Sequence, residues 1–110
     1  MRSEQNQKLL SALGLCRKAG KLICGTPLIC EALGSPTKKP YAVIMASDNS
    51  ENTQKKLRDK CTFYGVELIR VELEGDTLSD AIGKSGRISA VAVTDENFYR
   101  LLKGAMKSEQ

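Results

Sequence analysis

Apolar residues recur along this chain with two spacings. Apolar positions three or four apart predict amphipathic helices, and uninterrupted apolar runs such as residues 41–46 predict strands that are covered on both faces. On these patterns we expect helices over residues 3–18, 26–34, 47–64, 77–82 and from 94 to about 106. We expect strands over residues 21–24, 41–46, 66–71 and 88–93.

Turn and cap residues separate these segments. The first helix is expected to stop before Gly20 and the third before Gly65, because glycine commonly ends a helix. Thr26 is expected as the N-cap of the second helix, with Pro27 at its first helical position. Because helices alternate with apolar strands, we predict an α/β fold, a three-layer α/β/α sandwich with a four-stranded mixed sheet.

Composition is that of one soluble domain spanning residues 1–110. The chain is 41% hydrophobic and 27% charged, and no apolar run approaches the roughly 20 residues that span a bilayer. The first residues lack the apolar core of a secretory signal. We therefore expect a cytoplasmic monomer that does not associate with membranes.

Charge is distributed unevenly. Residues 1–60 carry 11 basic and 5 acidic side chains, whereas residues 61–110 carry 6 and 8. A basic segment beside a mildly acidic one favours an anionic partner, and nucleic acid is the commonest such partner for a domain of this size.

Catalytic and metal-binding patterns are scarce. The chain has no histidine, no nucleophile elbow and no zinc-ligand spacing among its four cysteines. Cys16 and Cys61 fall on apolar helical faces, which indicates buried structural thiols. Cys24 and Cys30 leave open a reactive thiol, because Cys24 precedes a helix N-terminus. We expect no enzyme activity, no cofactor and no metal.

Residues 83–87 form a glycine-hinged loop with two cations, Lys84 and Arg87, before an apolar strand. Its glycines allow backbone N–H groups to converge on an anion. A plain helix exit capped by Gly83 explains the same residues. The loop is not a nucleotide-binding P-loop, because Leu78 stands where that motif needs a glycine.

Three short polar segments are expected near strand ends and helix N-termini, where such sheets bind ligands. They are Gly25-Thr26-Pro27, the segment 47–50 with Asn49, and the loop 83–87 with Ser85. Together they predict one anion-binding rim. Ordinary helix capping is the alternative for each residue taken singly.

Several sequence blocks, in order, resemble one family. They are residues 14–22 (GLCRKAGKL), 48–53 (DNSENT), 59–61 (DKC), 82–84 (IGK) and 91–95 (VAVTD). This pattern is similar to the kink-turn-binding ribosomal proteins of the L7Ae/L30e superfamily, in their bacterial YlxQ-like branch. The resemblance implies an α/β/α sandwich that binds structured RNA through the start of its second helix and the loop before its last strand.

The chain departs from the family motif at that helix. Members that read kinked RNA open the helix with Gly-Thr-Asn-Glu-x-x-Lys, whereas this chain keeps Gly25 and Thr26 but has Pro27, Leu28 and Glu31 at the next three motif positions. Polar groups suited to base edges are thereby lost. The resemblance leaves backbone-binding groups, which are the helix N-terminal amides and Arg17, Lys18, Lys21, Lys84 and Arg87.

We therefore hypothesise a non-enzymatic protein that binds structured RNA, including ribosomal RNA, mainly through phosphates, with protein partners in a ribonucleoprotein. Neutralising Lys84 or Arg87 is expected to lower the salt dependence of binding by about one phosphate contact each. The rival hypothesis is a protein-interaction module on the same fold, with Leu28 as an apolar contact.

Overall fold

Helices and strands alternate along residues 4–107, which the computed structural model describes. Ser3, expected at the start of the first helix, lies outside this range. The order is α1 (Glu4–Lys18), β1 (Leu22–Cys24), α2 (Thr26–Leu33), β2 (Ala42–Met45), α3 (Glu51–Tyr64), β3 (Glu67–Arg70), α4 (Gly75–Ala81), β4 (Ala90–Val93) and α5 (Glu96–Lys107). Each expected segment is confirmed, with ends shifted by a few residues.

The four strands form one mixed sheet in the order β1-β4-β2-β3. Central strand β4 pairs antiparallel with β1 on one side and with β2 on the other, and β2 pairs parallel with β3. The last strand in sequence, β4, therefore lies between β1 and β2. The residues that precede and follow β4 in sequence lie next to the ends of these two strands.

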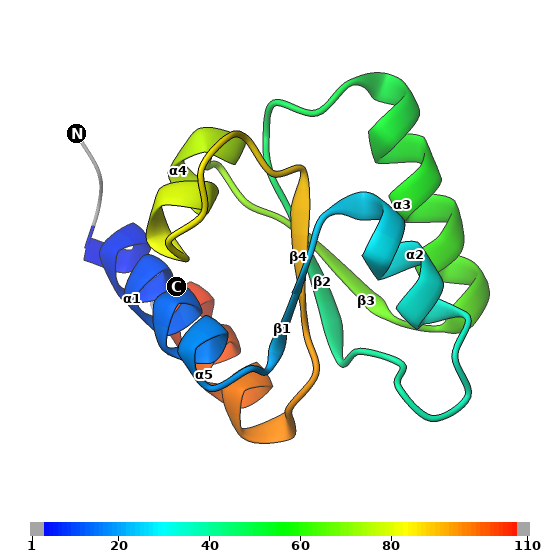
Figure 1. Cartoon of the computed structure of the whole chain (residues 1–110), viewed down its shortest axis with the longest axis horizontal. Helices are drawn as coiled ribbons and strands as arrows, with labels where there is room; N and C mark the ends of the chain where they lie inside the picture. Colours follow the sequence, from blue (N-terminus) through cyan, green and yellow to red (C-terminus); the bar gives the residue numbers. More distant parts are fainter. Residues whose placement is uncertain (1–3, 108–110) are drawn as a thin grey trace.

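Helices cover both faces of the sheet (Figure 1), which confirms the three-layer sandwich. Because side chains alternate along a strand, Val91 and Val93 pack into the core beneath α1, α4 and α5, whereas Ala90 and Ala92 pack into the core beneath α2 and α3. The small alanine side chains on this second face lie beneath α2 and α3.

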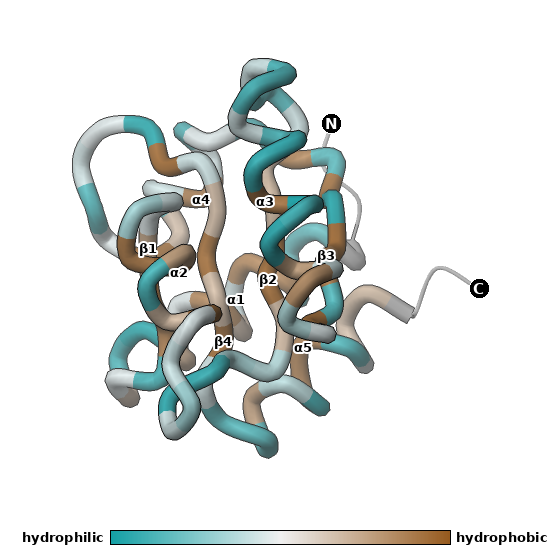
Figure 2. The backbone as a smooth tube through the Cα atoms, turned by 90° about the vertical axis from the view of Figure 1, so that its right-hand side faces the viewer, coloured by the Kyte–Doolittle hydropathy of each residue, from teal (hydrophilic) through white to brown (hydrophobic). Residues whose placement is uncertain are grey.

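Burial explains the uninterrupted apolar runs. Every residue of β2 and β4 is buried, and Figure 2 shows these strands in hydrophobic colours while α3 is largely hydrophilic. Within residues 4–107, no helix is both long and apolar enough to cross a bilayer.

Two helix starts differ from expectation. Gly25, with φ of 93°, is the N-cap of α2, so Thr26 and Pro27 are its first and second residues and Thr26 is not the cap. Helix α4 begins at Gly75, two residues before the expected Thr77. Glycine is a poor helix former, so the local pattern gave no reason to place Gly75 in a helix.

Candidate nucleic-acid interface

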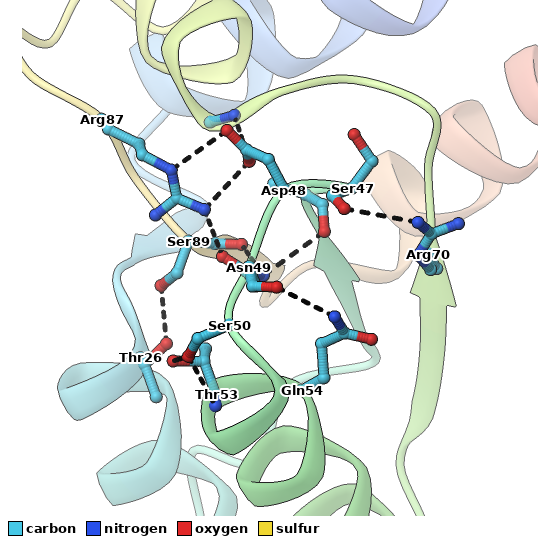
Figure 3. Close-up of polar contacts among 12 residues, drawn as sticks. Thr26, Ser47, Asp48, Asn49, Ser50, Thr53, Gln54, Arg70, Arg87 and Ser89 are labelled. Carbon is cyan, nitrogen blue, oxygen red and sulfur yellow. Dashed lines mark hydrogen bonds and ion pairs between the residues drawn. The ribbon is translucent and has the colours of Figure 1, made fainter.

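The three segments expected to form a rim meet at one end of the sheet (Figure 3). The Thr26 and Ser89 hydroxyl oxygens share a hydrogen bond of 2.6 Å, and Asn49 Nδ2 donates to the Ser89 carbonyl at 2.9 Å. We call this surface the rim: the start of α2 (25–28), the loop after β2 (46–50) and the segment before β4 (83–89). Ser89, which joins the other two segments, was not singled out from the sequence.

Asn49 joins these segments from the inside. Its side-chain amide donates to the carbonyls of Ala46 (3.3 Å) and Ser89 and accepts a hydrogen bond of 2.6 Å from Arg87 Nη2. Only 8% of the residue is exposed. Both N–H groups of the amide and one lone pair of Oδ1 are thus used within the protein, so Asn49 positions the rim loops. Its expected RNA contact stays a prediction and is restricted to the remaining lone pair of Oδ1.

Arg87 is held by Asp48 from the loop after β2. Its Nη2 and Nε lie 2.9 and 3.2 Å from the two Asp48 carboxylate oxygens, a bidentate ion pair. These hydrogen bonds lower the pKa of the Asp48 carboxyl and raise that of Arg87. Most of the positive charge of Arg87 is thus offset locally, and its remaining free N–H groups are on Nη1.

The ion pair lies against the start of α4. Gly75 N–H donates to Asp48 Oδ1 at 3.0 Å. A Cβ atom at Gly75 would lie 2.4 Å from the Ile88 carbonyl oxygen and 2.5 Å from Arg87 Cγ. Only glycine lets the segment before β4 pass this close to α4. No sequence signal pointed to this requirement, because the contact joins residues 12 and 13 positions apart.

The loop 83–87 leaves α4 as a helix exit. Gly83 has φ of 75°, its N–H donates to the Asp80 carbonyl at 3.2 Å, and Lys84 N–H donates to the Ser79 carbonyl at 3.0 Å. This pairing is a Schellman motif, which confirms the helix-cap interpretation of Gly83. Lys84 is exposed, and no carboxylate in residues 4–107 forms an ion pair with it. Ser85 is exposed in the same loop.

The start of α2 lacks a side-chain cap. The Ser50 hydroxyl oxygen accepts a hydrogen bond from Thr53 N–H in α3, and Asp95 Oδ2 accepts one from Phe98 N–H in α5. At α2 the N-cap is Gly25, and no side chain of the described residues caps it. Pro27 has no N–H, so the amides of Thr26 and Leu28 are the donors left for an external anion.

The remaining candidate cations do not all reach the rim. The Lys21 carbonyl accepts from Thr94 N–H, at the end of the β1–β4 pair opposite Gly25, whose N–H donates to the Ala90 carbonyl. Four residues of extended chain place these ends about 13 Å apart. Arg17 and Lys18 lie in the last turn of α1, just before Lys21. Lys21, which was grouped with Lys84 and Arg87 among the expected backbone-binding cations, therefore does not share the rim with them.

Thiol chemistry has little support at this surface. Burial raises the pKa of Cys24, although the nearby charges of Lys84 and Arg17 oppose the shift. Burial also raises the pKa of Cys16 and of Cys61 to about 11. These thiols are protonated at neutral pH and are poor nucleophiles. In the part of the chain that the structure describes, no three His, Cys, Asp or Glu side chains cluster as metal ligands would.

Comparison with known proteins gives a consistent result. The family model described as the ribosomal protein L7Ae/L30e/S12e/Gadd45 family matches residues 7–103. The chain is 38% identical to the RNA-binding protein YlxQ of Bacillus subtilis (strain 168) over 90 residues, which are 82% of this chain and 86% of that protein. It is 32% identical to the RNA-binding protein YlxQ of Enterococcus faecium over 94% of this chain and 95% of that one.

Solved structures agree on the fold. A Bacillus halodurans protein of unknown function has a TM-score of 0.79 and 33% identity, over 90% of this chain and 96% of that one. The Giardia lamblia 15.5kD RNA binding protein has a TM-score of 0.75 at 14% identity, over 98% of this chain and 89% of that one, and at this identity it shows the fold alone.

Proposed function

This chain belongs to the ribosomal protein L7Ae/L30e/S12e/Gadd45 family, and from that membership and the geometry of the rim we propose that it is a non-enzymatic protein that binds structured RNA. Its two curated relatives are named as RNA-binding proteins. The family does not by itself say which groups of this chain touch RNA, and those are argued from the rim.

The observation that carries the proposal is the uncapped start of α2, which lies against the segment that carries Lys84. The Thr26–Ser89 hydrogen bond of 2.6 Å joins the segment before β4 to the first residue of α2. Helix N-terminal amides and a lysine together favour an oxyanion, and RNA presents one at every nucleotide.

Contacts to phosphate rather than to base edges follow from the residues present. At the motif positions Pro27 has no side-chain hydrogen-bonding group, Leu28 is apolar and Glu31 repels phosphate. Both N–H groups of the Asn49 amide are bonded within the protein, and Arg87 is paired with Asp48. The rim is thus suited to the shape and charge of a folded RNA backbone, as found in ribosomal RNA or another ribonucleoprotein.

The decisive experiment compares two lysine variants. Binding of a labelled RNA hairpin with tandem G·A pairs is measured between about 50 and 200 mM salt for the wild type, Lys84→Gln and Lys55→Gln. Lys55 is a matched control, because it is paired with Asp59 on the exposed side of α3. We expect Lys84→Gln to reduce the slope of log affinity against log salt by the equivalent of about one phosphate contact. Lys55→Gln should leave this slope unchanged.

A fully paired hairpin completes the test. Because the proposal places no base contact at the rim, we expect it to bind within a few-fold of the tandem G·A hairpin. Salt-independent binding, or equal slopes for all three proteins, would refute the phosphate interface. Crosslinking in cells followed by sequencing of the attached RNA would identify the natural ligand.

A protein-interaction module is the second candidate, favoured by Leu28, which is 57% exposed in the first turn of α2. Capture of partners from an RNase-treated lysate separates the two functions. Partners that persist and are lost in Leu28→Ala support this module, and partners that vanish with RNA support the RNA-binding function.

A further inference from the structure

The end of the sheet opposite the rim carries a second group of cations around an exposed tyrosine. Ala42 pairs with Val93, and Leu22 pairs with the same residue from the other side. Tyr41 and Lys21 therefore flank Thr94 on neighbouring strands, with backbones about 10 Å apart. Tyr41 also lines a hollow of about 340 Å³ with Ile23, Thr37, Lys38, Lys39 and Thr94. We call Lys21, Lys38, Lys39, Tyr41 and Thr94 the Tyr41 face.

The Tyr41 ring is held in place and remains open. It stacks on Tyr99 with ring centroids 6.0 Å apart and planes 24° apart. The Tyr99 hydroxyl donates to Glu67 at 2.7 Å, and Glu67 is paired with Lys103 at 2.6 Å. Tyr41 nevertheless stays 46% exposed. An aromatic ring fixed by one neighbour and open to solvent is suited to stacking with a nucleobase.

The lysines of this face are positioned by the loop between α2 and β2. Lys39 Nζ donates to the Tyr64 carbonyl at 2.9 Å, and Lys38 N–H donates to the Ser35 hydroxyl oxygen at 3.1 Å. Of the carboxylates nearby, Glu67 is paired with Lys103, whereas Asp95 accepts a hydrogen bond from Phe98 N–H and keeps its charge. The three lysines of the face outnumber this one unpaired carboxylate.

A groove along α2 connects this face with the rim. A second hollow of about 430 Å³ is lined by Ile23, Leu28, Glu31, Ala32, Ser35 and Lys38. Ile23 and Lys38 line both hollows, and Leu28 belongs to the first turn of α2. The two hollows therefore adjoin each other between the first turn of α2 and Tyr41. Glu31 is the acidic residue among those lining the two hollows and repels phosphate, so the phosphates of a strand in this groove are expected near Lys38, the basic residue common to both hollows.

We propose that an unpaired strand continuing from an RNA bound at the rim follows this groove and stacks a base on Tyr41, with its phosphates near Lys21, Lys38 and Lys39. The inference rests on the proposed function, because the strand enters from the rim. In this proposal the rim binds structured RNA, and the Tyr41 face at the opposite end of the sheet binds the single strand that continues from it.

The test uses one hairpin with and without a tail of ten uridines, placed at the 5′ or the 3′ end. We expect one tail to raise the affinity of the wild type about 10-fold, the size of a single base–aromatic stack. Tyr41→Ala should abolish this gain without changing the affinity for the blunt hairpin, and Tyr41→Phe should keep it. Lys38→Gln should reduce the salt dependence of the gain.

Different results would refute the two proposals. A blunt hairpin that does not bind refutes the function of the rim, and a free ten-uridine oligonucleotide then still tests the Tyr41 face through Tyr41→Ala. A tail that gives no gain, or a gain that persists in Tyr41→Ala, overturns the inference. Thermal unfolding of both Tyr41 variants shows that they are folded.

Discussion

Replacing Asp48 by Asn should weaken the fold and strengthen the salt dependence of RNA binding at the same time. Asp48 accepts two hydrogen bonds from Arg87 and one from Gly75 N–H. The pair is partly open, with 39% of the Arg87 side chain and 37% of the Asp48 side chain exposed. Ion pairs in such positions contribute up to about 1 kcal/mol, so Asp48→Asn should cost about 1 kcal/mol of unfolding free energy.

Binding should change in the opposite direction. Without the carboxylate, the Arg87 charge at the rim is no longer offset, so a nearby phosphate is attracted more strongly. We expect the slope of log affinity against log salt to become steeper by roughly one phosphate contact, ~0.7 to 0.9 units. Asp59→Asn is the control, because it changes the net charge equally but removes a partner of Lys55 on the exposed side of α3.

Acidity gives a further check of the same ion pair. The pKa of Asp48 is lower in the folded chain than in the unfolded chain, where it is about 4. Its stabilising effect is therefore complete above about pH 5 and is lost as pH falls through the lowered folded value. Urea unfolding of the wild type and Asp48→Asn should differ at pH 7 and converge in acid. Equal salt slopes for Asp48→Asn and Asp59→Asn would refute the reasoning.

Two other predictions concern packing. Gly75→Ala should lower the free energy of unfolding in urea by about 1–3 kcal/mol, because the added Cβ would lie 2.4 Å from the Ile88 carbonyl oxygen. Gly104→Ala, with open space around its Cβ, should be neutral or stabilising by up to ~1 kcal/mol. Equal losses of stability in the two variants would contradict this prediction. Cys16 and Cys61, whose pKa values burial raises to about 11, should react with a thiol reagent at pH 8 only after unfolding, as peptide mapping of the labelled chain will test.

Local patterns were sufficient for the architecture. The apolar run over residues 41–46 predicted a strand buried on both faces, and β2 is such a strand. Gly65, with φ of 70°, ends α3 where a glycine was expected to end the helix. These features depend on neighbours within a few residues, so periodicity and turn chemistry identify them directly.

The details of the candidate site depend on distant residues instead. Nothing in the segment 83–87 shows that the guanidinium of Arg87 is already bound to Asp48, 39 positions earlier in the chain. Lys21 and Lys84 were both expected among the backbone-binding cations. Only the antiparallel register of β1 with β4 shows that Lys21 lies at the end of the sheet opposite the rim. Charge patterns predict how many cations exist but not which remain unpaired.

The missing cap of α2 has a consequence for how occupancy can be followed. An anion that fills the two first-turn amides completes the helix and binds only the native chain. Its binding therefore adds to stability in proportion to RT ln(1 + [L]/Kd), about 2.7 kcal/mol at a hundredfold excess over Kd. Melting temperature thus becomes a label-free titration of this end of the molecule, applicable even before the natural ligand is known.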